Sequence, residues 1–133
     1  MSKVNILDSE DDVLIIACGL AVQFALEAKE ILLADNINAT VMNLHTISPI
    51  DINAIVKYAK LTGAIVTAEE HQINGGMGSA VSEVLSRKHP TPQEFVGVQN
   101  TFGESGSGYE LLKKYGVSTN AIVKAVKKVI LRK

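Results

Sequence analysis

The chain has 133 residues and a formal net charge of −1, with 47% hydrophobic and 20% charged residues, the composition of one globular domain with its own core. A charge so close to neutral gives no field that would draw nucleic acid or a membrane surface to the protein, and no apolar run is long enough to span a bilayer. The single cysteine, Cys18, cannot form an internal disulfide, which favours a reducing cytoplasm. We therefore expect one cytoplasmic domain over residues 1–133, with neither nucleic acid nor membrane as a partner.

The first half of the chain alternates buried-type strands with amphipathic helices. We expect strands at 4–7, 13–18 and 39–44, with a helix between Gly19 and Asp35. The apolar face of that helix should contain Ala21, Phe24, Ala25, Ala28, Ile31 and Leu32. The run Ser-Pro-Ile-Asp at 48–51 then signals a second helix, with Ser48 as its cap and Pro49 in the first helical position. Its inward residues should be Ile52, Ile55, Val56 and Ala59.

The second half continues the alternation. We expect a strand at 64–68, a glycine-rich turn, a helix over about 80–87, and a strand at 95–98. A loop at 102–108, a short helix that ends before Gly116 and a final helix from Ser118 or Thr119 complete the chain. The inward residues should be Ala80, Val81, Val84 and Leu85 in the earlier helix, and Ile122, Val123, Val126 and Ile130 in the last. This order predicts an α/β fold, a mostly parallel sheet with helices on both faces.

The junction between the strand at 64–68 and the following helix is the main candidate site. Two carboxylates, a histidine and three glycines meet where ligands and partner surfaces usually lie in α/β proteins. The spacing matches neither a phosphate-binding P-loop nor a dinucleotide fingerprint. The candidate residues for an interface or an anion site are Glu69, Glu70, His71, Gly75, Gly76, Gly78 and Ser79.

Of these two uses, we expect a domain or subunit contact. Backbone amides at 76–78 could hold an anion at the start of the helix. However, Glu69 and Glu70 would repel a phosphate, and one like-charge pair at about 4 Å costs roughly 4 kcal/mol at an effective dielectric near 20. An arginine or an amide from another domain is therefore the expected guest.

The other polar residues have simpler explanations. Cys18 could be a stabilised thiolate near a helix start, but a buried, inert cysteine is favoured. Glu70 and His71 could form a structural ion pair, His45 could be a packed residue at a strand end, and His89 fits a helix end. No Cys/His cluster has the spacing of metal ligands, so we expect no metal site.

Five segments, in this order along the chain, resemble the C-terminal domain of the transketolase family. They are residues 17–19 (ACG), 43–51 (NLHTISPID), 68–81 (AEEHQINGGMGSAV), 102–106 (FGESG) and 110–116 (ELLKKYG). The glycine run is similar to deoxyxylulose phosphate synthases and to split, two-subunit transketolases, whereas the FGESG and KKYG segments are more similar to transketolase. Together they favour the C-terminal part of a split-type transketolase.

The resemblance implies a fold and a function. The fold is a three-layer α/β/α domain with a five-stranded mixed sheet in the order 1-3-2-4-5, in which the first strand is antiparallel. The glycine turn at Gly19 and the junction at 69–79 would then flank one crevice. The function is that of a non-catalytic assembly domain in an enzyme that transfers two-carbon ketol units between sugar phosphates.

The resemblance also implies the cofactors and partners. The family binds thiamine diphosphate and Mg²⁺ between two other domains, so this domain should have no catalytic, cofactor or metal residues of its own. Its partners should be the N-terminal transketolase domains or subunit, within a homodimer of the full enzyme. The alternatives are the C-terminal domain of 1-deoxyxylulose-5-phosphate synthase or of a 2-oxo acid dehydrogenase beta chain, and an independent small-anion-binding module.

Overall fold

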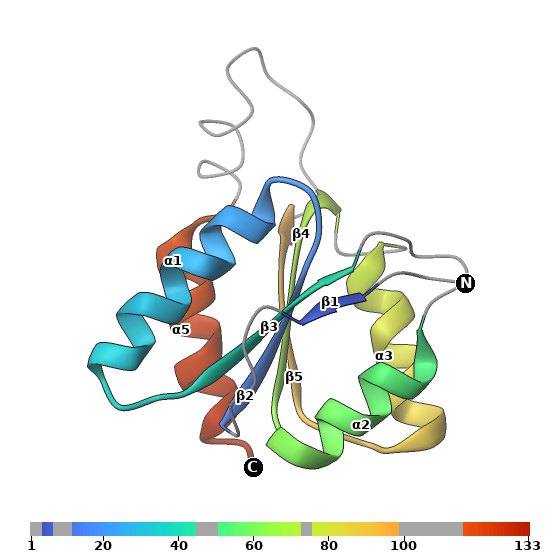
Figure 1. The fold of residues 1–133 in the computed structure, drawn as a ribbon. Coiled ribbons are helices and arrows are strands. Elements are labelled where there is room, and N and C mark those ends of the chain that lie inside the picture. Colours follow the sequence, from blue (N-terminus) through green and yellow to red (C-terminus); the bar gives the residue numbers. More distant parts are fainter. Residues whose placement is uncertain (1–3, 7–11, 45–50, 73–75, 99–115) are drawn as a thin grey trace.

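The fold is a twisted sheet between two layers of helices, seen in a computed structural model that describes residues 4–6, 12–44, 51–72, 76–98 and 116–133 (Figure 1). Four parallel strands form the body of the sheet in the order β3-β2-β4-β5: β2 (Val13–Ala17), β3 (Ala39–Leu44), β4 (Ile65–Gln72) and β5 (Gln93–Val98). The short β1 (Val4–Ile6) pairs antiparallel with β3 at one edge. This strand order is the one that the family resemblance implied.

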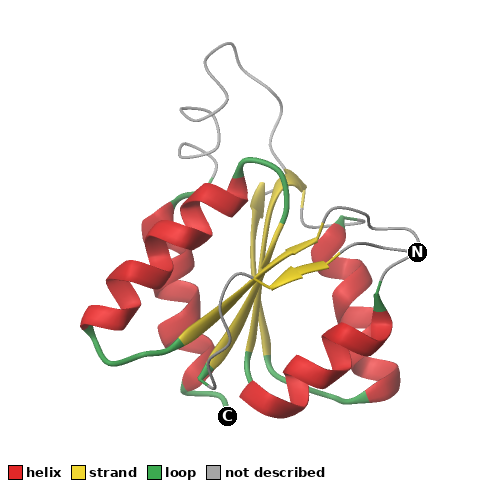
Figure 2. Ribbon diagram, in the orientation of Figure 1, coloured by secondary structure: helices red, strands yellow, loops and turns green. Residues whose placement is uncertain are grey.

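In the part of the chain that the structure describes, helices cover both faces of the sheet (Figure 2). Helices α1 (Ala21–Ala34) and α5 (Thr119–Ile130) lie together on one face, and α2 (Ile52–Thr62) and α3 (Met77–Lys88) lie on the other. Every residue of β2 is buried, because this strand is central and has helices on both sides. Its side chains alternate between the two cores: Val13, Ile15 and Ala17 point toward α1 and α5, and Leu14 and Ile16 point toward α2 and α3.

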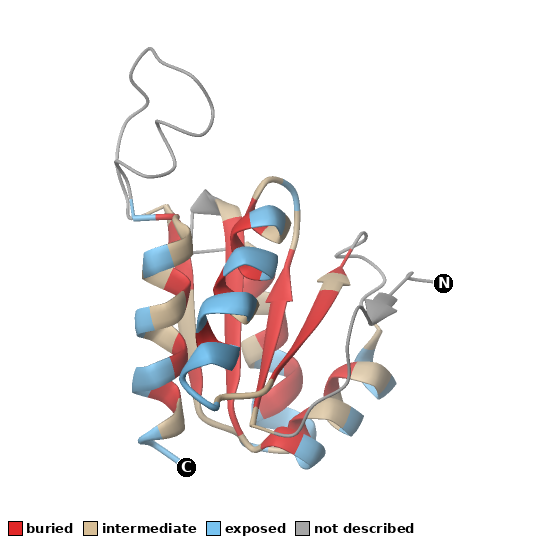
Figure 3. Ribbon diagram, turned by 60° about the vertical axis from the view of Figure 1, so that its left-hand side comes forward, coloured by how far each residue is buried: buried red, intermediate tan, exposed pale blue. Residues whose placement is uncertain are grey.

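The helix faces follow the predicted pattern with two exceptions (Figure 3). Ile31 and Ile52 were predicted to face inward, but they are 44% and 40% exposed. Ile31 lies at the margin of a face that Ala28 and Leu32 already occupy, and Ile52 is the first residue of α2. Among the described residues, no helix is long and apolar enough to cross a membrane.

Four predicted boundaries were wrong, one of them in β5, which begins at Gln93 rather than at Phe95. Helix α2 is capped by Asp51, whose side chain accepts a hydrogen bond from the Ala54 amide, rather than by Ser48. Helix α3 begins at Met77, within the glycine run, rather than at Ala80. Strand β4 continues to Gln72, which pairs with Val98 of β5 beyond a register irregularity. The residues Ser48 and Pro49 themselves lie outside the described residues, as do the predicted loop and short helix at 102–115.

Candidate functional site at the carboxyl ends of β2 and β4

The candidate site lies where the chain changes from one face of the sheet to the other. Strands β2 and β4 are parallel neighbours, with Ala17 opposite Ala68. The chain leaves β2 for α1 on one face and leaves β4 for α3 on the opposite face. This is a topological switch point, the kind of place at which open α/β sheets generally have their ligand crevice.

Glu69 caps the amino end of α3. Its two carboxylate oxygens accept hydrogen bonds from the backbone amides of Met77 and Gly78, each at 2.7 Å. The side chain is only 1% exposed, and the N-cap residue itself, Gly76, has no side chain with which to cap the helix. A buried carboxylate thus satisfies two free amides and lies at the positive end of the helix dipole.

This arrangement changes the interpretation of the glycine run. The sequence predicted that Glu69 would repel an anion from the amides at 76–78, but Glu69 is itself the anion that they bind. An external phosphate would have to displace a buried carboxylate from two charge-assisted hydrogen bonds. In this conformation, these two amides are therefore not open to a ligand.

Gly78 is required by close packing. A Cβ atom at this position would lie 2.8 Å from the Phe95 ring, 2.8 Å from Thr67 Oγ1 and 3.0 Å from Glu69 Oε2. The Gln93 side-chain amide donates to Thr67 Oγ1 and to the Gly78 carbonyl, both at 3.1 Å. Close packing therefore leaves no room for a side chain at this position.

Glu70 lies on the other side of β4, because successive strand residues point to opposite faces. Its carboxylate lies against the backbone of Gly19, where a Cβ would be 2.6 Å from Glu70 Cδ. Gly19 has a φ of +62°, a left-handed conformation that glycine adopts without strain. The position therefore requires glycine for both its backbone conformation and the space that Glu70 occupies.

The pKa of the Cys18 thiol reflects the charges at the switch point. Burial, then the negative charges of Glu69 and Glu70, raise the pKa of its thiol from an ordinary value of 9.0 to about 11. A thiol with this pKa is protonated at neutral pH and is a poor nucleophile. The inert interpretation of Cys18 is therefore favoured, and the crevice carries a negative field.

The structure brings together only part of the predicted set. Gly76, Gly78 and Ser79 lie at the start of α3, next to Glu69, while Glu70 faces the β2–α1 turn. The backbone of His71 belongs to β4, its side chain is outside the described part, and Gly75 and His45 are also outside it. His89 ends α3 as predicted.

Sequence reasoning missed two polar residues of the site, Thr67 and Gln93. Both are buried, at 0% and 9% exposure, and they join β4 to β5 and α3. Oε1 of Gln93 is buried without a hydrogen-bond partner among the described residues. The one available signal was a threonine inside the otherwise apolar run at 64–68.

The sequence of residues 2–122 matches the family model described as transketolase, C-terminal domain. The chain belongs to this family. This is the family that the sequence motifs resemble, and the observed strand order is the one that the resemblance implied.

Known relatives include both transketolases and synthases. The chain is 41% identical over 133 residues to the 6-deoxy-6-sulfo-D-fructose transketolase subunit SqwH of Clostridium sp. strain MSTE9, covering all of this chain and 41% of that protein. It is 36% identical over 126 residues to the 1-deoxy-D-xylulose-5-phosphate synthase of Desulforudis audaxviator, covering 93% of this chain and 20% of the relative. The chain thus spans about two fifths of the first relative and about one fifth of the second.

A solved structure described as a split gene transketolase, an inactive beta4 tetramer, has the same fold. It superposes with a TM-score of 0.92 at 45% identity, covering 97% of this chain and 42% of that one. This likeness of fold agrees with the family assignment.

Proposed function

We propose that this chain is the C-terminal, non-catalytic assembly domain of a split-type, thiamine diphosphate-dependent transketolase that transfers two-carbon ketol units between sugar phosphates. Two findings support the split type: the similarity to a transketolase subunit and the similarity to a split gene transketolase. Its partner is the subunit or domain that completes the enzyme, in a homodimeric assembly in the cytoplasm.

The observation that carries the non-catalytic role is the engagement of Glu69. The helix amino end at the switch point is the place where an α/β domain would bind an anionic substrate or cofactor. Here its Met77 and Gly78 amides bind a buried carboxylate of the same chain. The junction therefore serves the stability of the domain rather than substrate binding.

The described residues do not fit thiamine diphosphate and Mg²⁺, the group that the family implies for the parent enzyme. A diphosphate requires hydrogen-bond donors and positive charge, whereas the crevice amides are engaged and the carboxylates of Glu69 and Glu70 act on Cys18 as negative charges. We assign no step of the reaction to this chain.

We further propose that the outer side of the junction, at Glu70, Gly76 and Ser79, contacts another domain or subunit. All three residues are half-buried in this chain, and the negative field at Glu70 suits an arginine or a backbone amide. Changing Glu70 to Ala and Gly76 to Val in the full enzyme should weaken assembly before it alters the Michaelis constants for sugar phosphates. A selectively raised Michaelis constant with intact assembly would instead make the junction a substrate site.

An assay of the intact parent enzyme tests the reaction class. We expect activity with xylulose 5-phosphate plus ribose 5-phosphate and none with pyruvate plus glyceraldehyde 3-phosphate. The opposite result would assign the parent to the deoxyxylulose phosphate synthases. A further donor, 6-deoxy-6-sulfo-fructose, belongs in the assay because a relative is named for it.

A further inference from the structure

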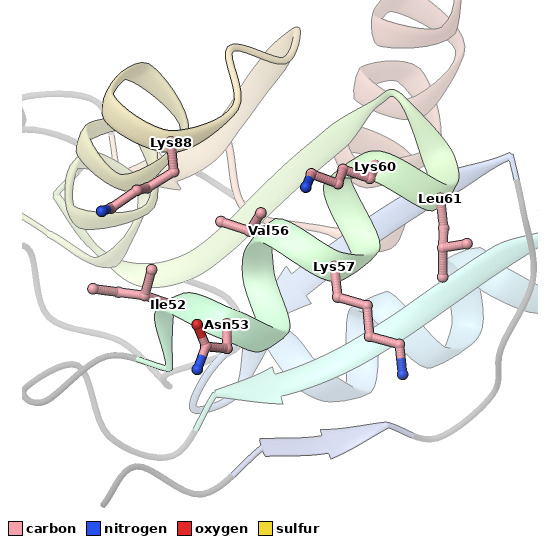
Figure 4. Close-up of a pocket in the computed structure, with 7 residues that line it drawn as sticks. All are labelled: Ile52, Asn53, Val56, Lys57, Lys60, Leu61 and Lys88. Carbon is pink, nitrogen blue, oxygen red and sulfur yellow. The ribbon is translucent and has the colours of Figure 1, made fainter.

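We draw no further inference here: the strongest candidate, the hollow of about 820 Å³ along α2 that Lys57, Lys60 and Lys88 line (Figure 4), carries nothing because nothing in the structure shows what covers it.

Discussion

The carboxylate of Glu69 should be worth a large part of the stability of this domain. It is 1% exposed and binds the amides of Met77 and Gly78 at 2.7 Å. In Glu69→Gln, only one side-chain oxygen remains, so one helix amide faces an NH₂ group and loses its acceptor. The loss of one charge-assisted bond and the buried unsatisfied amide each cost about 1–3 kcal/mol, and the smaller cost of burying a neutral group offsets part of this.

We therefore expect Glu69→Gln to lower the free energy of unfolding by about 2 kcal/mol, which for a domain of this size lowers Tm by about 6–10 °C. Urea denaturation followed by circular dichroism measures the first quantity, and a thermal scan measures the second. Glu83→Gln is the control, because the side chains of its ion pair with Arg87 are 66% and 73% exposed and such pairs contribute under about 1 kcal/mol. Equal stability of the two variants would show that Glu69 does not hold α3.

Three further results are expected. Gly78→Ala should lower the free energy of unfolding, measured in urea, by about 1–2 kcal/mol, because the strain of the added Cβ against Phe95 and Thr67 exceeds the gain in helix propensity. A variant more stable than the unmodified chain would show that the neighbouring side chains move aside without cost. The Cys18 thiol, with its pKa raised to about 11, should react with iodoacetamide at pH 7–8 far more slowly in the folded chain than in urea, and equal rates in the two states would contradict the shift. Because the unfolded chain releases this proton at lower pH, the free energy of unfolding should fall as pH rises from 9.0 toward 11. Calorimetry should detect no binding of thiamine diphosphate with Mg²⁺ to this chain alone, and micromolar binding would show that it contains cofactor residues.

Local pattern predicted most of the secondary structure. A continuous apolar run with β-branched residues, such as Val13–Ala17, predicts a strand that is buried on both faces. A helix at the surface of a domain has apolar side chains on one side only. Strand order is a property of long-range pairing and is not encoded in periodicity, and it came here from the family resemblance. The boundary errors at α2 and α3 arose because caps depend on which side chain reaches a free amide, as Asp51 does for Ala54.

The place of the site was predicted, but its internal chemistry was not. A strand followed by a glycine-rich turn and a helix indicates a switch-point junction wherever it occurs. The bond from Glu69 to the Gly78 amide spans 9 residues, and the bond from Gln93 to Thr67 spans 26. Both depend on how β4, β5 and α3 pack together, which composition and spacing do not specify.

Removal of this domain from the parent enzyme tests the central proposal most directly. The proposed function predicts that the enzyme without residues 1–133 loses dimer affinity in analytical ultracentrifugation and loses ketol transfer from xylulose 5-phosphate as a consequence. Addition of the separate domain should restore both in part. A truncated enzyme with unchanged dimer affinity and unchanged activity would contradict the assembly role.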